Sequence, residues 1–283
     1  WGKSELPVTS AKESQIESTT KSQTPEPVTT GKTDMVQSVL TFDGKDDYIT
    51  VPDSRNLQIS AYTVEAWIKP SGKPNEDWKG IVGKPGRNFN IWLHNAGFIH
   101  HRFHSNSNTN AGAPDTPNGS VQWDQWSHVA ITNDGQTAKT YINGNLLAQG
   151  ATGGTLVVDK TPLYIGRELD GNSARYFKGE MAEIRIWNQA RSQEEIKQSM
   201  NQRLKGDEAG LVGYWPLNEG SENIAKDKTS NGNNGTINGA TWGKSELPVT
   251  SAKESQIEST TKSQTPEPVT TGKTDMVQSV LTF

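Results

Sequence analysis

The chain has 283 residues, a formal net charge of −4 and an apolar share of 31 %, well below the ~45–50 % of typical soluble domains. Charges of both signs are mixed along the sequence, so no basic stripe is available for a polyanion and we expect no nucleic-acid partner. Cysteine is absent, which excludes disulfides and thiolate metal sites. No apolar run approaches the ~20 residues of a membrane-spanning helix, so we expect no membrane insertion.

The two ends of the chain carry the same sequence. Trp1–Phe42 recurs without a substitution as Trp242–Phe283. Such identity indicates a tandem array of surface repeats, with a cloning artefact or a circular-permutation scar as the alternative. On the tandem-repeat interpretation, Trp1 is the end of the preceding repeat, and neighbouring copies of the same repeat are expected partners.

Residues 1–35 are dominated by Ser, Thr, Lys, Glu and Pro. A segment of this composition has too little to bury, which predicts a linker, and 243–276 repeat it. Residues 277–283 are then the first strand of the next repeat. Ser and Thr mixed with Pro are also typical of O-glycosylated stalks, with a plain tether as the alternative. The glycosylation candidates are Thr19, Thr20, Thr24, Thr29 and Thr30.

Residues 36–242 instead show short alternating runs between turn residues, the pattern of a β-sandwich. In the run 62–69, Val64, Ala66 and Ile68 fall on one face because side chains alternate along a strand. The Asn-Gly pair at 143–144 predicts a tight hairpin. We expect strands at 39–42, 47–51, 62–69, 80–84, 89–93, 97–103, 126–133, 137–143, 146–150, 163–167, 182–187 and 211–217.

One helix is predicted after Ser192, which can cap it while Glu195 completes a capping box. Its expected apolar stripe is Ile196, Met200 and Leu204, and Gly206 is expected to end it. The pattern as a whole predicts an all-β fold: a two-sheet antiparallel jelly-roll sandwich with one short helix.

Six segments between about Val36 and Trp242 carry a family resemblance. They read LTFDGKDDYITVPDS, YTVEAWIKP, QWSHVAITNDGQTAKTYINGNLLAQG, LYIGRELDG, FKGEMAEIRIWNQARSQEEI and GYWPLNEGSENIAKDKTSNGNNGTINGATW. In this order they resemble the laminin-G-like, pentraxin-like branch of the concanavalin-A-like lectin/glucanase superfamily. The resemblance implies a mostly non-enzymatic domain that binds glycans, phosphorylated ligands or proteins at loop ends, often through calcium.

Catalytic groupings are absent from the sequence pattern. Glucanases of this fold carry a Glu-x-Asp-x-Glu strand with its carboxylates on one face. The nearest run here offers only Glu180 and Glu183, which have opposite parity. His100 and His104 lie ~13 Å apart if they share a strand, too far for one zinc ion. We therefore expect no enzyme, and a structural role for His128.

A calcium site is implied by the resemblance to pentraxins. Their Gly-x-Glu-x-Asp segment corresponds to Gly166–Asp170, so Glu168 and Asp170 would offer carboxylates and Leu169 its carbonyl, with Asn88 as a further ligand. This set suits at most one calcium ion. The alternative is a solvated loop in which Glu168 pairs with Arg167 or Arg175. A second acidic turn, which we assign to turn chemistry rather than to a ligand set, comprises Asp43, Asp46 and Asp47.

Glycan contact requires an aromatic face with nearby amides. Trp78 and Trp123 stand in loop-like sequence, and residues 105–120 are too polar for core, which predicts a surface loop. The candidate binding residues are Trp78, Trp123, Asn106, Asn108 and Asn110. The alternative is a mobile loop with no binding role. The tryptophans assigned to packing are Trp67, Trp126, Trp187 and Trp215.

These observations favour a non-catalytic structural or adhesive module of an extracellular or cell-surface tandem-repeat protein, with filament formation as one option for the array. Extracellular glycans or surface proteins are its expected ligands. Residues 277–283 could pair with an edge of the preceding sandwich and lock successive domains together. The alternative function is a lectin-like carbohydrate-binding module attached to a catalytic domain.

Overall fold

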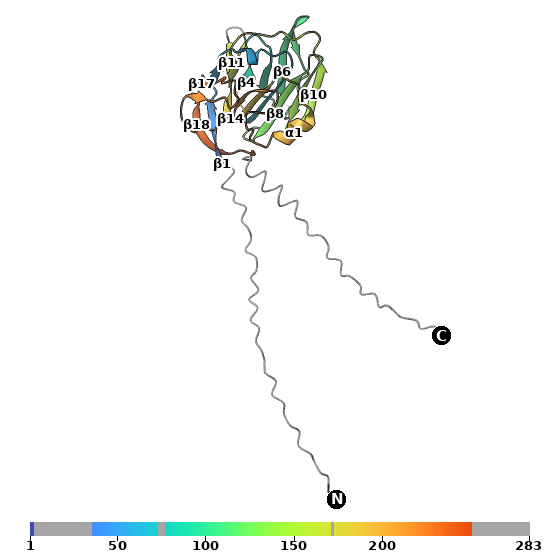
Figure 1. Cartoon of the computed structure of the whole chain (residues 1–283), viewed down its shortest axis with the longest axis vertical. Helices are drawn as coiled ribbons and strands as arrows, with labels where there is room; N and C mark the ends of the chain where they lie inside the picture. Colours follow the sequence, from blue (N-terminus) through green and yellow to red (C-terminus); the bar gives the residue numbers. More distant parts are fainter. Residues whose placement is uncertain (3–35, 73–76, 171–172, 251–283) are drawn as a thin grey trace, which may run out of the picture. The chain divides into compact units, whose positions relative to one another are not determined.

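The computed structural model of the chain describes residues 1–2, 36–72, 77–170 and 173–250. Trp1 and Gly2 belong to a separate unit, and the rest forms an antiparallel sandwich of two large sheets with one α-helix (Figure 1). The predicted all-β jelly roll with one short helix is confirmed. The five glycosylation candidates, most of both linkers and the strand expected at 277–283 lie outside the described residues.

The first sheet, sheet A, has eight strands. Its order is β10 (Asn145–Ala151), β9 (Thr137–Ile142), β8 (Ser127–Asn133), β3 (Tyr62–Pro70), β14 (Lys178–Trp187), β1 (Val36–Asp43) and β18 (Thr241–Glu246), with β15 (Leu211–Trp215) paired to β14.

The second sheet, sheet B, also has eight strands. Its order is β16 (Ile224–Ala225), β17 (Gly235–Asn238), β2 (Tyr48–Val51), β11 (Leu163–Ile165), β4 (Trp78–Gly83), β5 (Asn90–His94), β6 (Ile99–Ser105) and β7 (Asn108–Gly112). A separate hairpin joins β12 (Arg167–Asp170) to β13 (Ser173–Tyr176), and a 3-10 turn, η1, covers Arg55–Leu57.

The main core lies between the two sheets. Val64, Ala66 and Ile68 of β3 all belong to it, as their alternation predicts. On the opposite face of β3, Glu65 and Trp67 are also buried. Sheet A is therefore covered on both faces, and the outer cover has to come from elements that do not belong to either sheet.

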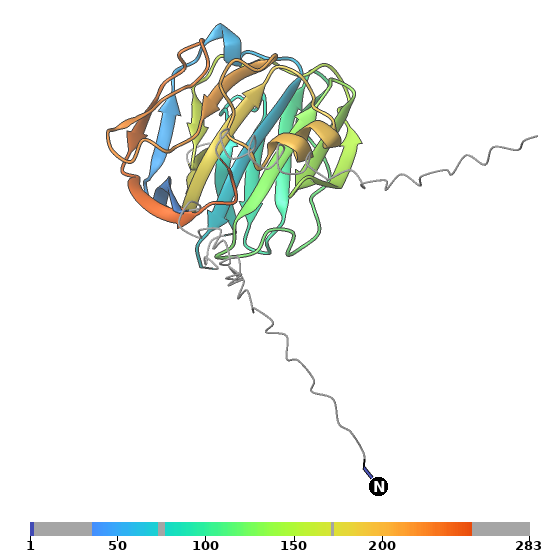
Figure 2. The same cartoon turned by 60° about the horizontal axis from the view of Figure 1, so that its bottom comes forward.

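That cover is α1 (Gln193–Ser199) and the chain that follows it (Figure 2). The predicted capping box of Ser192 and Glu195 is confirmed, and Ile196 packs on Ala130 of sheet A. The helix ends at Ser199, several residues before Gly206, the end that the sequence predicts. Carbonyls after the helix accept hydrogen bonds from buried side chains instead. The Met200 carbonyl accepts one from the Trp67 indole at 2.7 Å.

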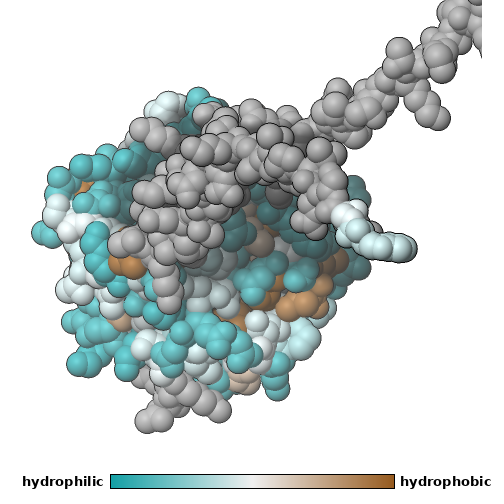
Figure 3. Space-filling view, turned by 90° about the horizontal axis from the view of Figure 1, so that it is seen from below, coloured by the Kyte–Doolittle hydropathy of each residue, from teal (hydrophilic) through white to brown (hydrophobic). Residues whose placement is uncertain are grey.

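The sandwich continues beyond Trp242, the domain boundary that the sequence predicts. β18 pairs with β1 up to Glu246 opposite Val36. Leu247 and Val249 are then buried at 0 % and 2 % exposure. The surface in Figure 3 is mostly hydrophilic with small hydrophobic patches. Among the described residues, no helix has the length and apolarity to cross a membrane.

Candidate functional site

The outer face of sheet B is the large sheet surface that α1 leaves open. The hairpin β12–β13 lies against part of it, directly over β4. This approach depends on Gly80 and Gly83, because a Cβ at Gly80 would collide with the Glu168 backbone and a Cβ at Gly83 would lie 2.8 Å from Glu168 Oε2. Glu168 is accordingly only 2 % exposed. The strands β4, β5 and β6 on one side of the hairpin carry a group of rings.

These rings point outward because of strand alternation. Ile91 and Leu93 of β5 enter the main core, so Trp92 and His94 project to the opposite face. The register places His94 opposite Trp78 of β4 and Trp92 opposite His100 of β6. We define the aromatic surface as Trp78, Trp92, His94, Phe98 and His100.

Trp78 is at the centre of the aromatic surface. Its ring centroid lies 4.6 Å from that of His94, 5.2 Å from His100 and 5.6 Å from both Trp92 and Phe98. His94 and Phe98 stack at 4.3 Å. All but Trp92, which is 6 % exposed, are half-buried. The result is a contiguous, partly exposed surface of aromatic rings.

Polar groups border the aromatic surface. The guanidinium carbons of Arg175 and Arg87 lie 5.3 Å and 5.8 Å from the Trp92 ring centroid. His100 Nδ1 contacts the carboxylate of Asp115. Burial lowers the pKa of His100, and Asp115 opposes this shift. The buried indole Nε1 of Trp92 has no hydrogen-bond partner in the part of the chain that the structure describes.

The predicted calcium segment lies in β12 of the hairpin instead of a loop. Glu168 Oε1 accepts a hydrogen bond from Asn90 Nδ2 at 3.0 Å. Asn88 donates its amide to the carbonyls of Ile59 (3.0 Å) and Val157 (3.1 Å). The amide that contacts the Glu168 carboxylate is thus that of Asn90, two residues after the predicted ligand Asn88. The side chains of Leu169 and Asp170 lie outside the described residues.

The Asp43–Asp47 turn brings three carboxylates together. Asp43, Asp46 and Asp47 each offer an oxygen within 4.8 Å of the others, a set whose chemistry fits a hard divalent cation. The turn also uses these groups internally: Asp47 Oδ2 accepts from the Asp43 backbone at 2.7 Å and Asp43 Oδ1 from the Lys45 backbone at 2.8 Å. A groove of about 630 Å³ adjoins the turn, lined in part by Asp43, Lys69 and Lys178.

The other predicted ligand-binding residues do not gather into one site. Trp78 begins a strand, and Trp123 is partly buried against the main core. Residues 105–120 are not a single loop, because β7 pairs with β6 within them. Asn106 exchanges two hydrogen bonds with the Thr155 backbone. Asn108 and Asn110 lie in β7, and the side chain of Asn110 is not described.

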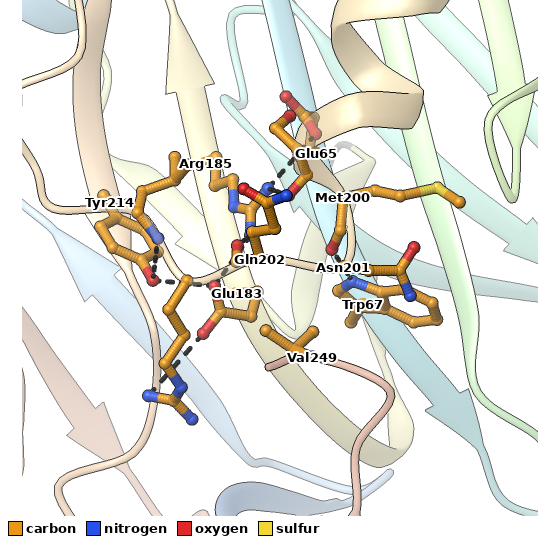
Figure 4. Close-up of polar contacts among 12 residues, drawn as sticks. Glu65, Trp67, Glu183, Arg185, Met200, Asn201, Gln202, Tyr214 and Val249 are labelled. Atoms are coloured by element: carbon orange, nitrogen blue, oxygen red, sulfur yellow. Dashed lines mark hydrogen bonds and ion pairs between the residues drawn. The ribbon is translucent and has the colours of Figure 1, made fainter. Parts of the chain in front are cut away.

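A second polar cluster lies beneath α1 (Figure 4). Glu183 Oε2 receives hydrogen bonds from Arg185 (2.9 Å) and from the Tyr214 hydroxyl (2.8 Å), and Glu65 Oε1 receives one from Trp187 (2.7 Å). Both carboxylates are completely buried. A substrate cannot reach them in this arrangement, so the cluster is structural. The aromatic surface remains the best candidate site.

The comparisons agree with this architecture. Residues 43–197, more than half of the chain, match the family model described as the concanavalin A-like lectin/glucanases superfamily. The chain therefore belongs to this superfamily. The curated proteins contain no match.

Several solved structures are similar to this chain. A proposed carbohydrate-binding protein of Bacteroides ovatus is 25 % identical with a TM-score of 0.62, over 76 % of this chain and 62 % of that one. This chain thus spans less than two thirds of that protein. A heptameric SAP-like pentraxin of Limulus polyphemus (19 %, TM-score 0.43, 58 % and 82 % covered) and the CBM40 of a Ruminococcus gnavus IT-sialidase, bound to α2,3-sialyllactose (14 %, 0.47, 58 % and 96 %), are more distant.

Proposed function

We propose that this chain is a non-catalytic carbohydrate-binding module that holds a sugar against the aromatic surface. The observation that carries the proposal is the group of half-buried rings around Trp78 on the open face of sheet B. A pyranose ring has an apolar face that packs on an aromatic ring, and contiguous exposed aromatic surface marks a ligand site. The superfamily and the Bacteroides ovatus relative support this ligand class.

The polar groups that border the aromatic surface suit the hydroxyl groups of a sugar. Hydroxyl groups need donors and acceptors around an apolar platform. The Asp115 carboxylate can accept a hydrogen bond from a sugar hydroxyl, and the His100 ring beside it can donate or accept one. We infer that the pyranose ring packs on the aromatic surface and that Asp115 and His100 orient it.

Glycan-array binding of the full chain tests the proposal. We expect a signal for the unmodified chain that Trp78→Ala lowers at least tenfold, since one stacked ring contributes on the order of 1.4 kcal/mol or more. Thr236→Ala, which changes an exposed residue of β17 on the same sheet, is the control and should bind normally. Equal binding by Trp78→Ala, at unchanged melting temperature, would show that the aromatic surface does not bind the sugar.

We also propose an extracellular or cell-surface location in a tandem array, where binding to glycans or surface proteins makes the chain adhesive. The support is the identity of Trp1–Phe42 with Trp242–Phe283. Intact mass of the native protein against a recombinant chain tests whether the Ser/Thr/Pro segments carry glycans. Excess mass on these segments supports a glycosylated stalk. Equal masses favour a bare tether and a lectin-like module attached to a catalytic domain.

Calcium is the metal that we propose for this domain, at the Asp43–Asp47 turn or at Glu168. Removal of calcium should lower the melting temperature, because a ligand that binds only the folded state stabilises it. Asp43→Asn with Asp46→Asn should abolish this shift if the turn holds the ion, and Glu168→Gln should abolish it if the hairpin does. A shift that survives in both variants, or no shift in the unmodified chain, contradicts the proposal.

A further inference from the structure

The last described segment of the chain closes the sandwich. We define the closing segment as Trp242–Thr250. Its first part forms most of β18, with Trp242 opposite Leu40 and Glu246 opposite Val36. Its second part turns over the outer face of sheet A, where Leu247 and Val249 pack on Val39, Trp67 and Ala182.

Polar contacts fix the closing segment in place. The Val249 carbonyl accepts a hydrogen bond from Gln37 Nε2 at 2.6 Å, and the Pro248 carbonyl accepts one from Asn201 Nδ2 at 2.7 Å. The Thr250 backbone donates to Asn201 and accepts from Arg203. The closing segment is thus held by strand pairing with β1, by the packing of two aliphatic side chains and by hydrogen bonds at its end. Figure 4 shows Val249 near Trp67 and Asn201.

Trp1–Thr9 has the same sequence as the closing segment, WGKSELPVT. Leu6 and Val8 correspond to Leu247 and Val249, and Lys3 corresponds to Lys244. Every side chain that the position binds is therefore present twice in one chain. The two copies differ in how they are attached, since the closing segment follows β17 directly whereas Trp1–Thr9 precedes β1.

The geometry of β1 permits Trp1–Thr9 to reach the same position from the N-terminal side of β1. The end of the closing segment lies beside the start of β1, because Val36 is opposite Glu246 and Gln37 bonds to Val249. If Trp1–Thr9 occupied the position, residues 10–35 would only have to link two neighbouring points. The entropic cost of closing such a loop rises slowly with its length.

We propose that Trp1–Thr9 is an alternative occupant of the closing position, able to complete the sandwich when the closing segment leaves it. The domain then has two ways to close: from its own end, as in residues 36–250, or from the copy that precedes it. In an array, the first leaves residues 10–35 as a tether between domains, and the second makes them a loop within one domain.

Three variants of the full chain test this exchange by thermal unfolding. Leu247→Asp with Val249→Asp disables the closing segment, Leu6→Asp with Val8→Asp disables the copy, and the third variant combines all four changes. We expect the copy variant to melt like the unmodified chain and the closing variant to lose only a few degrees. The combined variant should melt about 10 °C or more below the closing variant, or not fold. Equal melting of the closing and combined variants would overturn the proposal.

A disulfide reports occupancy directly, because Lys244 lies opposite Ser38 and its Nζ is 2.8 Å from the Ser38 hydroxyl. The chain has no cysteine of its own. Lys3→Cys with Ser38→Cys, in the closing variant, should form a disulfide under mild oxidation, within one chain or between two. Lys244→Cys with Ser38→Cys in the otherwise unmodified chain is the positive control. A folded closing variant in which positions 3 and 38 do not become linked would also overturn the proposal.

Discussion

Buried titratable side chains determine how the stability of the fold depends on acidic pH. His101 is 0 % exposed, with Nε2 2.9 Å from the Tyr62 hydroxyl, and burial lowers its pKa to about 3. His128 is also completely buried, and burial lowers its pKa although its contact with Glu65 opposes the shift. Its structural role is thus clear from its packing on Trp67 and its 3.1 Å contact with Glu65.

The lowered pKa values of these two histidines predict that the folded state loses stability as pH falls. Their pKa values in the folded chain lie below 6.5, the ordinary value of a histidine. The contribution of these histidines to stability is therefore fully present above pH 6.5. It is lost as pH falls toward the folded values, because only the unfolded chain binds the protons. Between pH 6.5 and its folded pKa, His101 contributes a slope that approaches about 1.4 kcal/mol per pH unit. Urea unfolding between pH 7 and pH 5 should show a smaller slope for His101→Gln, and an unchanged slope contradicts the assignment.

Glu65 adds to this acid sensitivity at lower pH. Burial alone would raise its pKa, but the His128 contact and the charges of Arg185 and Arg191 hold the pKa at about 2. The contribution of Glu65 to stability is thus present above its usual value of 4.5 and is lost as pH falls from there toward 2. Neither this carboxylate nor its partners stand out in the sequence, because Glu65 alternates with core residues as a surface residue would.

At the scale of single elements, the hairpin β12–β13 depends on a glycine. The backbone of Glu168 occupies the space of a Cβ at Gly80. Gly80→Ala should therefore lower the free energy of unfolding by about 1–3 kcal/mol. Gly243→Ala in β18 is a milder control, since the closest atom to its Cβ would be the Thr41 hydroxyl at 3.0 Å. Equal effects in denaturant unfolding would show that the hairpin does not press on β4.

Most elements of the fold could be predicted because their cause is local. Alternation located β3, β5 and β8 to within a residue or two, and the capping box located the start of α1. The hairpin at β12–β13 was missed because its four-residue strands carry little alternation. Its position on sheet B depends on Gly80 and Gly83, which are far from it in the sequence.

The aromatic surface was only partly predictable. Trp78 was selected, but it was expected in a loop with Trp123, which instead packs on the core. Its true neighbours come from β5 and β6, and only the register of those strands brings Trp92 and His100 to it. The alternation of Ile91 and Leu93 with Trp92 and His94 was the available signal, since it places aromatic rings on the outer face.

At the scale of the whole molecule, the C-terminal boundary of the domain can be tested by truncation. Chains of residues 36–250 and 36–242 should differ in melting temperature by about 10 °C, because the shorter one loses the buried side chains of Leu247 and Val249 together with most of β18. Composition could not reveal this boundary, since the two buried residues stand within a polar, linker-like sequence. Equal melting temperatures would support a domain that ends at Trp242.

Carbohydrate binding by the aromatic surface on the open face of sheet B can be followed through the indole N–H resonances in a ¹H–¹⁵N spectrum, with the sugar found by glycan array as the titrant. We expect the resonances of Trp78 and Trp92 to shift with saturable titration curves, while those of the buried Trp187 and Trp215 stay in place. Shifts that spare both Trp78 and Trp92 while the sugar binds would contradict binding at the aromatic surface.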